Sequence, residues 1–175
     1  MHPTLIPTKR LIANVEGAMN AVLVQGDAVG ATLYYGKGAG AEPTASAVIA
    51  DLVDVTRMHT ADPENRVPHL AFQPNAMADL KILPMDEVQT SYYLRLRVQD
   101  KPGVLADITR ILADEQISID AVIQKEPGEG EDQADLIMLT HLTREKRINA
   151  AIRKIEALGV VAGKVTKLRL EELGK

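Results

Sequence analysis

The C-terminal half of the chain alternates between two regular patterns of hydrophobic and polar residues. Segments such as YYLRLRVQ place apolar side chains at every second position, which is typical of a strand with one buried face. Other segments repeat apolar residues every three or four positions, which predicts amphipathic helices. Strands are predicted at residues 92–99, 117–125, 134–142 and 161–170, and helices at 103–115 and 144–158.

This order of elements, βαββαβ, has a consequence for the architecture. Two right-handed crossovers joined by one hairpin give a four-stranded antiparallel sheet with both helices on one face. The other face stays open, and Tyr93, Arg95 and Arg97 should lie on it. Its residues should be polar if the face is solvated and mixed if it pairs with something. Thr143 is expected to cap the second helix.

The first 58 residues are less regular. Gly26–Asp27 is a turn signal between two apolar runs, which predicts a hairpin of Ala21–Val24 with Ala28–Tyr35. LIANV, residues 11–15, is interpreted as a short strand. A glycine-rich turn, GKGAG, leads to a helix expected from Pro43 to about Arg57. Its apolar stripe is Val48, Ile49, Leu52 and Val53.

Residues 59–89 hold four prolines and no sustained period, so they are interpreted as a connector, with LKIL at 80–83 as one short strand. The expected division is 1–58, 59–89 and 90–175. The predicted fold class is α+β: a ferredoxin-like βαββαβ domain preceded by a partial α/β segment of hairpin, glycine-rich turn and helix.

Composition narrows the function classes. Hydrophobic residues make up 46%, enough to bury a core. The net charge is −4 without a basic excess in either half, and aromatics reach only 3%, so no nucleic-acid partner is expected. There is no signal peptide or membrane-spanning run, hence no membrane partner and a cytoplasmic location by default. No cysteine is present and the four histidines are scattered, so no metal site is expected.

The segment DKPGVLADITRILADEQISIDAVIQ, at residues 100–124, resembles the ACT domain, a small regulatory module. In that family the loop between the first strand and the first helix binds an amino acid, usually at a dimer interface. The resemblance implies an effector site formed by Asp100, Lys101, Gly103, Val104, Leu105, Ser118 and Ile119. Ser118 stands where the family often has asparagine. DKPG also makes a good turn without any ligand.

Three segments of residues 1–58 resemble the end of the homoserine dehydrogenase catalytic domain: HPTLIP, GAMNAVLVQGD and above all YYGKGAGAEPTASAVIADLVD. The resemblance implies that Gly38, Ala39 and Gly40 lie beside NADP or NAD in the complete enzyme. The family's dinucleotide fold and its catalytic lysine and acidic residues are not found, so no catalytic residue is assigned. Tight cofactor binding by this chain is not expected.

Together the two resemblances imply the C-terminal regulatory portion of homoserine dehydrogenase, an enzyme of threonine and methionine biosynthesis. The expected effector is threonine, and the expected assembly is a homodimer or higher homo-oligomer through the ACT domains. Two alternatives stay open: an ACT module that only holds subunits together, and a stand-alone amino-acid-binding protein. Whether the chain is a natural truncation or a piece of a longer protein also stays open.

Overall fold

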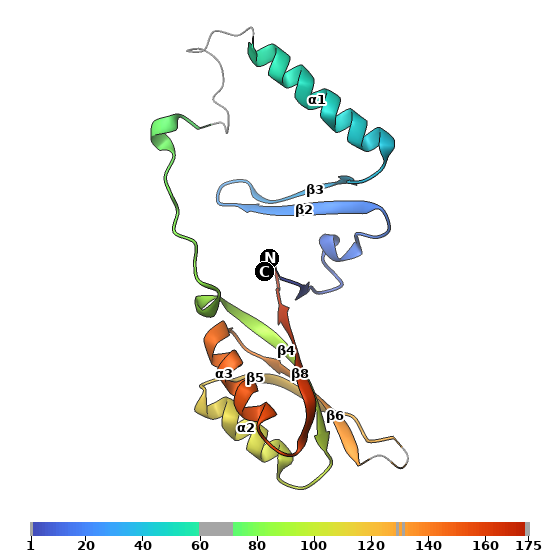
Figure 1. Ribbon diagram of the computed structural model, residues 1–175, viewed down its shortest axis with the longest axis vertical. Coiled ribbons are helices and arrows are strands. Elements are labelled where there is room, and N and C mark those ends of the chain that lie inside the picture. Colours follow the sequence, from blue (N-terminus) through green and yellow to red (C-terminus); the bar gives the residue numbers. More distant parts are fainter. Residues whose placement is uncertain (1, 60–71, 129, 131, 174–175) are drawn as a thin grey trace. The chain divides into compact units, whose positions relative to one another are not determined.

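The computed structural model describes residues 2–59, 72–128, 130 and 132–173 (Figure 1). The chain divides into two compact units. One consists of Thr8–Lys81, and the second consists of Met1–Pro7 together with Ile82–Lys175. These boundaries follow packing, whereas the functional division at residues 58 and 89 stays a prediction. No helix of the described residues is long and apolar enough to cross a membrane.

The unit Met1–Pro7 with Ile82–Lys175 has the predicted βαββαβ order. Its elements are β4 (Gln89–Gln99), α2 (Val104–Asp114), β5 (Ile119–Gln124), β6 (Gln133–Thr140), α3 (Glu145–Glu156) and β8 (Val161–Leu170). The strands pair antiparallel in the order β8-β4-β6-β5, which confirms the ferredoxin-like prediction. A two-residue strand, β1 (Thr4–Leu5), adds to β8 in parallel and was not predicted from the sequence.

The hydrophobic core of this unit lies between the sheet and the two helices, which cover the same face (Figure 1). The alternation predicted for β4 is confirmed, since Leu94 and Leu96 are fully buried while Arg95 and Arg97 are exposed. The helices contribute their apolar stripes to the same layer. The core side chains from α2 and α3 are Val104, Ile108, Leu112, Ile148, Ala151 and Ile155.

The opposite face of the sheet is mixed in character. Cross-strand pairing places Leu168, Tyr93 and Leu139 in one row over β8, β4 and β6. The next row holds Arg95, whose guanidinium lies 3.6 Å from the Asp135 carboxylate. Apolar and charged rows therefore share one half-exposed surface.

A buried carboxylate ties α3 to the sheet. Glu145, the first residue of α3, is only 3% exposed and accepts a hydrogen bond of 2.6 Å from the Tyr92 hydroxyl. It also pairs with Lys167, and with Arg169 at 2.7 Å. Burial alone would raise the pKa of Glu145, but the hydrogen bonds from Lys167, Tyr92 and Arg169 outweigh it and lower the pKa from 4.5.

The prediction that Thr143 caps this helix is wrong. Arg144 is the capping residue, in extended conformation and without a side-chain capping bond. Thr143 instead belongs to a short strand, β7 (Thr143–Arg144), which pairs with the start of β4. Its hydroxyl is buried and has no hydrogen-bond partner in the described part of the chain.

The unit Thr8–Lys81 contains the predicted hairpin and helix. The first hairpin strand, β2 (Met19–Gly26), is longer than predicted, and the second, β3 (Gly30–Lys37), begins and ends two residues later than predicted. The helix α1 spans Ala41–His59, and a short 3-10 turn, η2, follows at Pro74–Ala76. Residues 60–71 of the predicted connector lie outside the described residues. A second short turn, η3 (Met85–Glu87), precedes β4.

Two short strands predicted from apolar runs are wrong. Residues 11–14 form a 3-10 helix, η1 (Leu11–Asn14), and the side-chain amide of Asn14 donates to the backbone carbonyls of Thr8 and Arg10, which closes a turn. Residues 80–83 form no strand within the described residues, and Ile82 is 89% exposed. Neither segment has a neighbouring strand in the described chain that would supply ladder hydrogen bonds.

Candidate functional site

The loop from β4 to α2 surrounds a cavity of about 420 Å³. The backbone of this loop is fixed by hydrogen bonds from the Asp100 amide to the Asp132 carbonyl, 3.0 Å, and from the Lys101 amide to the Gln99 carbonyl, 3.0 Å. The loop therefore presents a defined surface. The cavity is lined by Val98, Gln99, Asp100, Lys101, Pro102, Gly103, Val104, Leu105, Gln124 and Leu136.

Gly103 determines how the loop enters the helix. Its φ of +94° lies in the left-handed region, where a side chain would be strained, and a Cβ there would meet open space. The N-cap residue of α2 is Gly103 itself, so no N-cap side chain bonds to the first turn, and the acid in that turn is Asp107. The backbone amides of the helix start, with their partial positive charge, therefore line the cavity without a bond from an N-cap side chain.

Asp100 is the acidic group of the cavity. Its Oδ1 accepts a hydrogen bond of 3.2 Å from the Gln124 side-chain amide at the end of β5. This contact orients the carboxylate while leaving its second oxygen for another donor. The cavity thus combines a carboxylate, a helix N-terminus and apolar side chains, among them Val98 and Leu136, within one compact unit.

Five of the seven predicted effector residues come together here: Asp100, Lys101, Gly103, Val104 and Leu105. Ser118 and Ile119 do not line this cavity. They lie at the start of β5, the opposite end of the strand from Gln124, and the Ser118 carbonyl accepts a bond from the His141 amide. Their assignment stays a prediction.

Gln124 also lines the cavity, although it is not among the effector residues expected from the sequence. The local sequence of β5 carries no signal for this position. The pairing of Gln124 with Leu136 of β6, and of Val98 with Ala134 next to it, brings the residue to the β4–α2 loop. Only the sheet order β4-β6-β5 reveals that proximity.

The glycine-rich turn, Gly38–Gly40, lies in the other unit between β3 and α1. Both glycines have local reasons to be glycine. A Cβ on Gly38 would lie 2.3 Å from the Asn20 side-chain nitrogen, and Gly40 has a φ of +124°. The turn is exposed and its backbone is open to close approach, so it fits contact with a dinucleotide. It offers mainly backbone for that contact, and the assignment of Gly38, Ala39 and Gly40 stays a prediction.

Comparison with known proteins covers both units. The homoserine dehydrogenase family profile matches residues 1–53, and the ACT domain profile matches residues 92–160. Homoserine dehydrogenase from Pseudomonas aeruginosa is 57% identical over 173 residues, which are 99% of this chain and 40% of the relative. The enzyme from Methylobacillus glycogenes is 62% identical over 175 residues, covering 100% of this chain and 41% of its own length.

Among solved structures, a homoserine dehydrogenase from Thiobacillus denitrificans matches with a TM-score of 0.88 and 72% sequence identity. The match covers 99% of this chain and 38% of that one. The chain spans about two fifths of the length of the relatives it matches. It belongs to the homoserine dehydrogenase family and corresponds to the C-terminal part of such an enzyme, the end of the catalytic region followed by an ACT domain.

Proposed function

We propose that the chain is the regulatory portion of a homoserine dehydrogenase and that the Asp100–Leu105 cavity binds an amino-acid effector, threonine. The complete enzyme would interconvert L-homoserine and L-aspartate 4-semialdehyde with NADP or NAD, in the cytoplasm. The observation that carries the proposal is the cavity itself, in which a carboxylate and an uncapped helix start face one another.

An amino acid has the two charges that this cavity complements. Its carboxylate would lie against the amides of Gly103, Val104 and Leu105, where the helix dipole favours an anion. Its ammonium would donate to Asp100, with the carboxylate held in place by Gln124. A short side chain such as that of threonine would contact Val98 and Leu136.

Self-association is the second part of the proposal. The open sheet face carries Tyr93, Leu139 and Leu168 in one row beside the Arg95–Asp135 pair. A face that only met water would be more uniformly polar. The edge strand β5 is also available for pairing with another copy. A dimer mate on β5 would lie close to Gln124 and could close the effector cavity.

The effector assignment is tested by titrating threonine into the full chain and following its melting temperature and binding heat. Threonine should raise the melting temperature, by mass action worth about 2.7 kcal/mol at roughly a hundred times Kd. Alanine should have no such effect. Asp100→Ala should lose the response, and Asp114→Asn, which changes an exposed acid at the opposite end of α2 outside the cavity, should keep it.

The alternative is a scaffold that holds subunits together without sensing an amino acid. The scaffold would be supported if the chain stays oligomeric but millimolar threonine produces no binding heat and does not raise its melting temperature. Catalysis is a separate matter: the chain by itself should not oxidise homoserine with NAD or NADP, since no acid–base residues of that reaction are assigned to it. Turnover above a buffer control would refute that expectation.

A further inference from the structure

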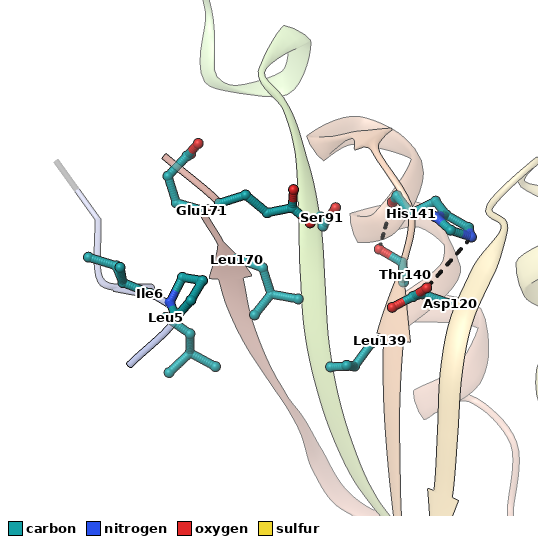
Figure 2. Close-up of a pocket in the computed structure, with 11 residues that line it drawn as sticks. Leu5, Ile6, Ser91, Asp120, Leu139, Thr140, His141, Leu170 and Glu171 are labelled. Atoms are coloured by element: carbon teal, nitrogen blue, oxygen red, sulfur yellow. Dashed lines mark hydrogen bonds and ion pairs between the residues drawn. The ribbon is translucent and has the colours of Figure 1, made fainter. Parts of the chain in front are cut away.

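A second cavity, of about 430 Å³, lies at the other end of the sheet and shares no lining residue with the effector cavity. We call it the β1 pocket, because Leu5, Ile6 and Pro7 form one wall. Its floor is apolar and consists of Leu5, Leu170 and Leu139. Figure 2 shows these leucines together, with Asp120, Thr140 and His141 lying to one side of them. Its size falls within the range of small-molecule sites.

Strand register explains the floor. Leu5 pairs with Leu170, and Leu170 pairs with Ser91, so these three residues form one row across β1, β8 and β4. The row lies on the open face, like Tyr93 and Leu139. Without β1 the row would end at Leu170 and the pocket would lose the wall formed by residues 5–7.

A bulge in β5 supplies one of the pocket's acidic side chains. Ile119 pairs with Thr140 and Ala121 pairs with Leu139, so Asp120 is an extra residue opposite a single step of β6. Such bulges redirect side chains. Asp120 thereby lines the same pocket as Leu139 and Thr140, and its carboxylate lies 3.9 Å from the His141 ring.

The charge of the lining is one-sided. The carboxylates of Asp120, Glu171 and Glu172 line the pocket, and no lysine or arginine is among its described lining residues. An anion would be repelled by this lining, whereas a cation would be attracted to it. No group of three potential metal ligands occurs among the described residues, which argues against a metal ion.

We propose that the β1 pocket binds an organic cation, an ammonium group on a short alkyl chain. The alkyl chain covers the leucine floor, and the ammonium donates to Asp120 at the rim. The ligand contacts β1 and the main sheet at once, so its binding holds β1 on β8. Occupation of the pocket therefore stabilises the docked position of the segment that leads into the unit Thr8–Lys81.

The proposal is tested with n-butylammonium and the full chain, by following amide resonances in NMR titrations. Saturable shifts are expected around Leu5, Asp120, Leu139 and His141. Butyrate and n-butanol, which match its length without the positive charge, should produce none at equal concentration. Equal responses to the three compounds, or no saturable response to the amine, would overturn the proposal.

Two variants localise the binding. Asp120→Asn removes the charge with little change in shape and should weaken butylammonium binding about two- to fivefold, because the Asp120 side chain is 56% exposed and solvent screens the ion pair. Leu5→Ala should weaken it as well, since it removes part of the floor. Asp107→Asn serves as the matched control and should leave the affinity unchanged. Wild-type affinity in Asp120→Asn would contradict the assignment.

The ammonium can come from a free amine or from a lysine side chain of a second copy. Sedimentation of the chain with and without butylammonium distinguishes the two sources. If a lysine of a second copy occupies the pocket, the amine competes with it and the oligomer dissociates. If the natural ligand is a free amine, the oligomeric state stays constant while the NMR shifts saturate. The proposal does not depend on threonine binding, because the two cavities share no residue.

Discussion

The two compact units of this chain achieve their order in different ways. The unit with β4, β6 and β8 encloses a continuous core in which residues such as Leu96 and Ile108 are fully buried. In the unit Thr8–Lys81 no described residue reaches that degree of burial. The apolar stripe of α1 is more than half exposed at Val48, Ile49 and Leu52. The first unit is stabilised by its own packing, whereas α1 presents a hydrophobic face that no described residue covers fully.

The largest effect is expected in the core. Leu96→Ala should lower the free energy of unfolding of the ACT unit by about 4 kcal/mol, because it removes buried methyl groups and leaves a cavity. Val22 lies on the hairpin of the other unit, and its side chain is 61% exposed. Val22→Ala should change the free energy of unfolding of that unit by less than about 0.5 kcal/mol. Urea unfolding monitored by circular dichroism measures both. Similar losses of unfolding free energy in the two variants would contradict the proposed difference in packing between the units.

The second-largest effect is expected for Glu145→Ala. It should lower the free energy of unfolding by about 3 kcal/mol, because Lys167 and Arg169 would lose the carboxylate that pairs with them. Glu145→Gln, which keeps an acceptor for Tyr92, should cost less. The lowered pKa also sets a pH dependence. The contribution of Glu145 is present above the unfolded-state pKa and is lost as pH falls through the lower folded-state pKa. Wild type should therefore lose stability in that acidic window, and a variant without the carboxylate should lose less.

Gly40→Val should have a smaller and local effect. Its φ of +124° is strained for any side chain, and a Cβ would lie 3.3 Å from Pro43 Cδ, so the start of α1 should be disturbed at a cost of about 1–2 kcal/mol. NMR shifts should be confined to residues near the β3–α1 turn, with the melting of the ACT unit unchanged. Shifts that spread into β4 or β6 would show that the units are energetically coupled.

Glu87→Gln should have the smallest effect. Glu87 pairs with Lys146 at 2.8 Å and Arg144 at 3.4 Å, but all three side chains are more than a third exposed and solvent screens the pairs. The midpoint of urea unfolding should stay within experimental error at physiological salt. A loss as large as that of Glu145→Ala would show that exposure does not decide the strength of ion pairs here.

The difference in burial between the two units also explains which elements could be predicted from the sequence. Every strand and helix of the βαββαβ order was predicted, because alternation in β4 and helical spacing in α2 follow directly from burial on one face. The short strands predicted at 11–15 and 80–83 failed, since an apolar run without a neighbouring strand has no ladder to join. The hairpin and α1 were predicted from turn chemistry and spacing.

In the cavity between β4 and α2, the loop Asp100–Leu105 was predicted from its motif and its resemblance to a known ligand loop. Gln124 was not among the predicted residues of this cavity, because its place beside Asp100 depends on the order of the strands in the sheet. The β1 pocket was missed entirely. Neither the pairing of Leu5 with Leu170 nor the bulge at Asp120 has a local signature that one sequence reveals.

The pairing of β1 with β8 also bears on the order in which the chain folds. Thr4 has its partner at Arg169, so β1 can pair only after the residues up to Arg169 have been synthesised. The sheet β8-β4-β6-β5 can close beforehand from more local contacts. Because β1 pairs with β8 through only two residues, we expect this contact to form after the sheet has closed and to open before the rest of it.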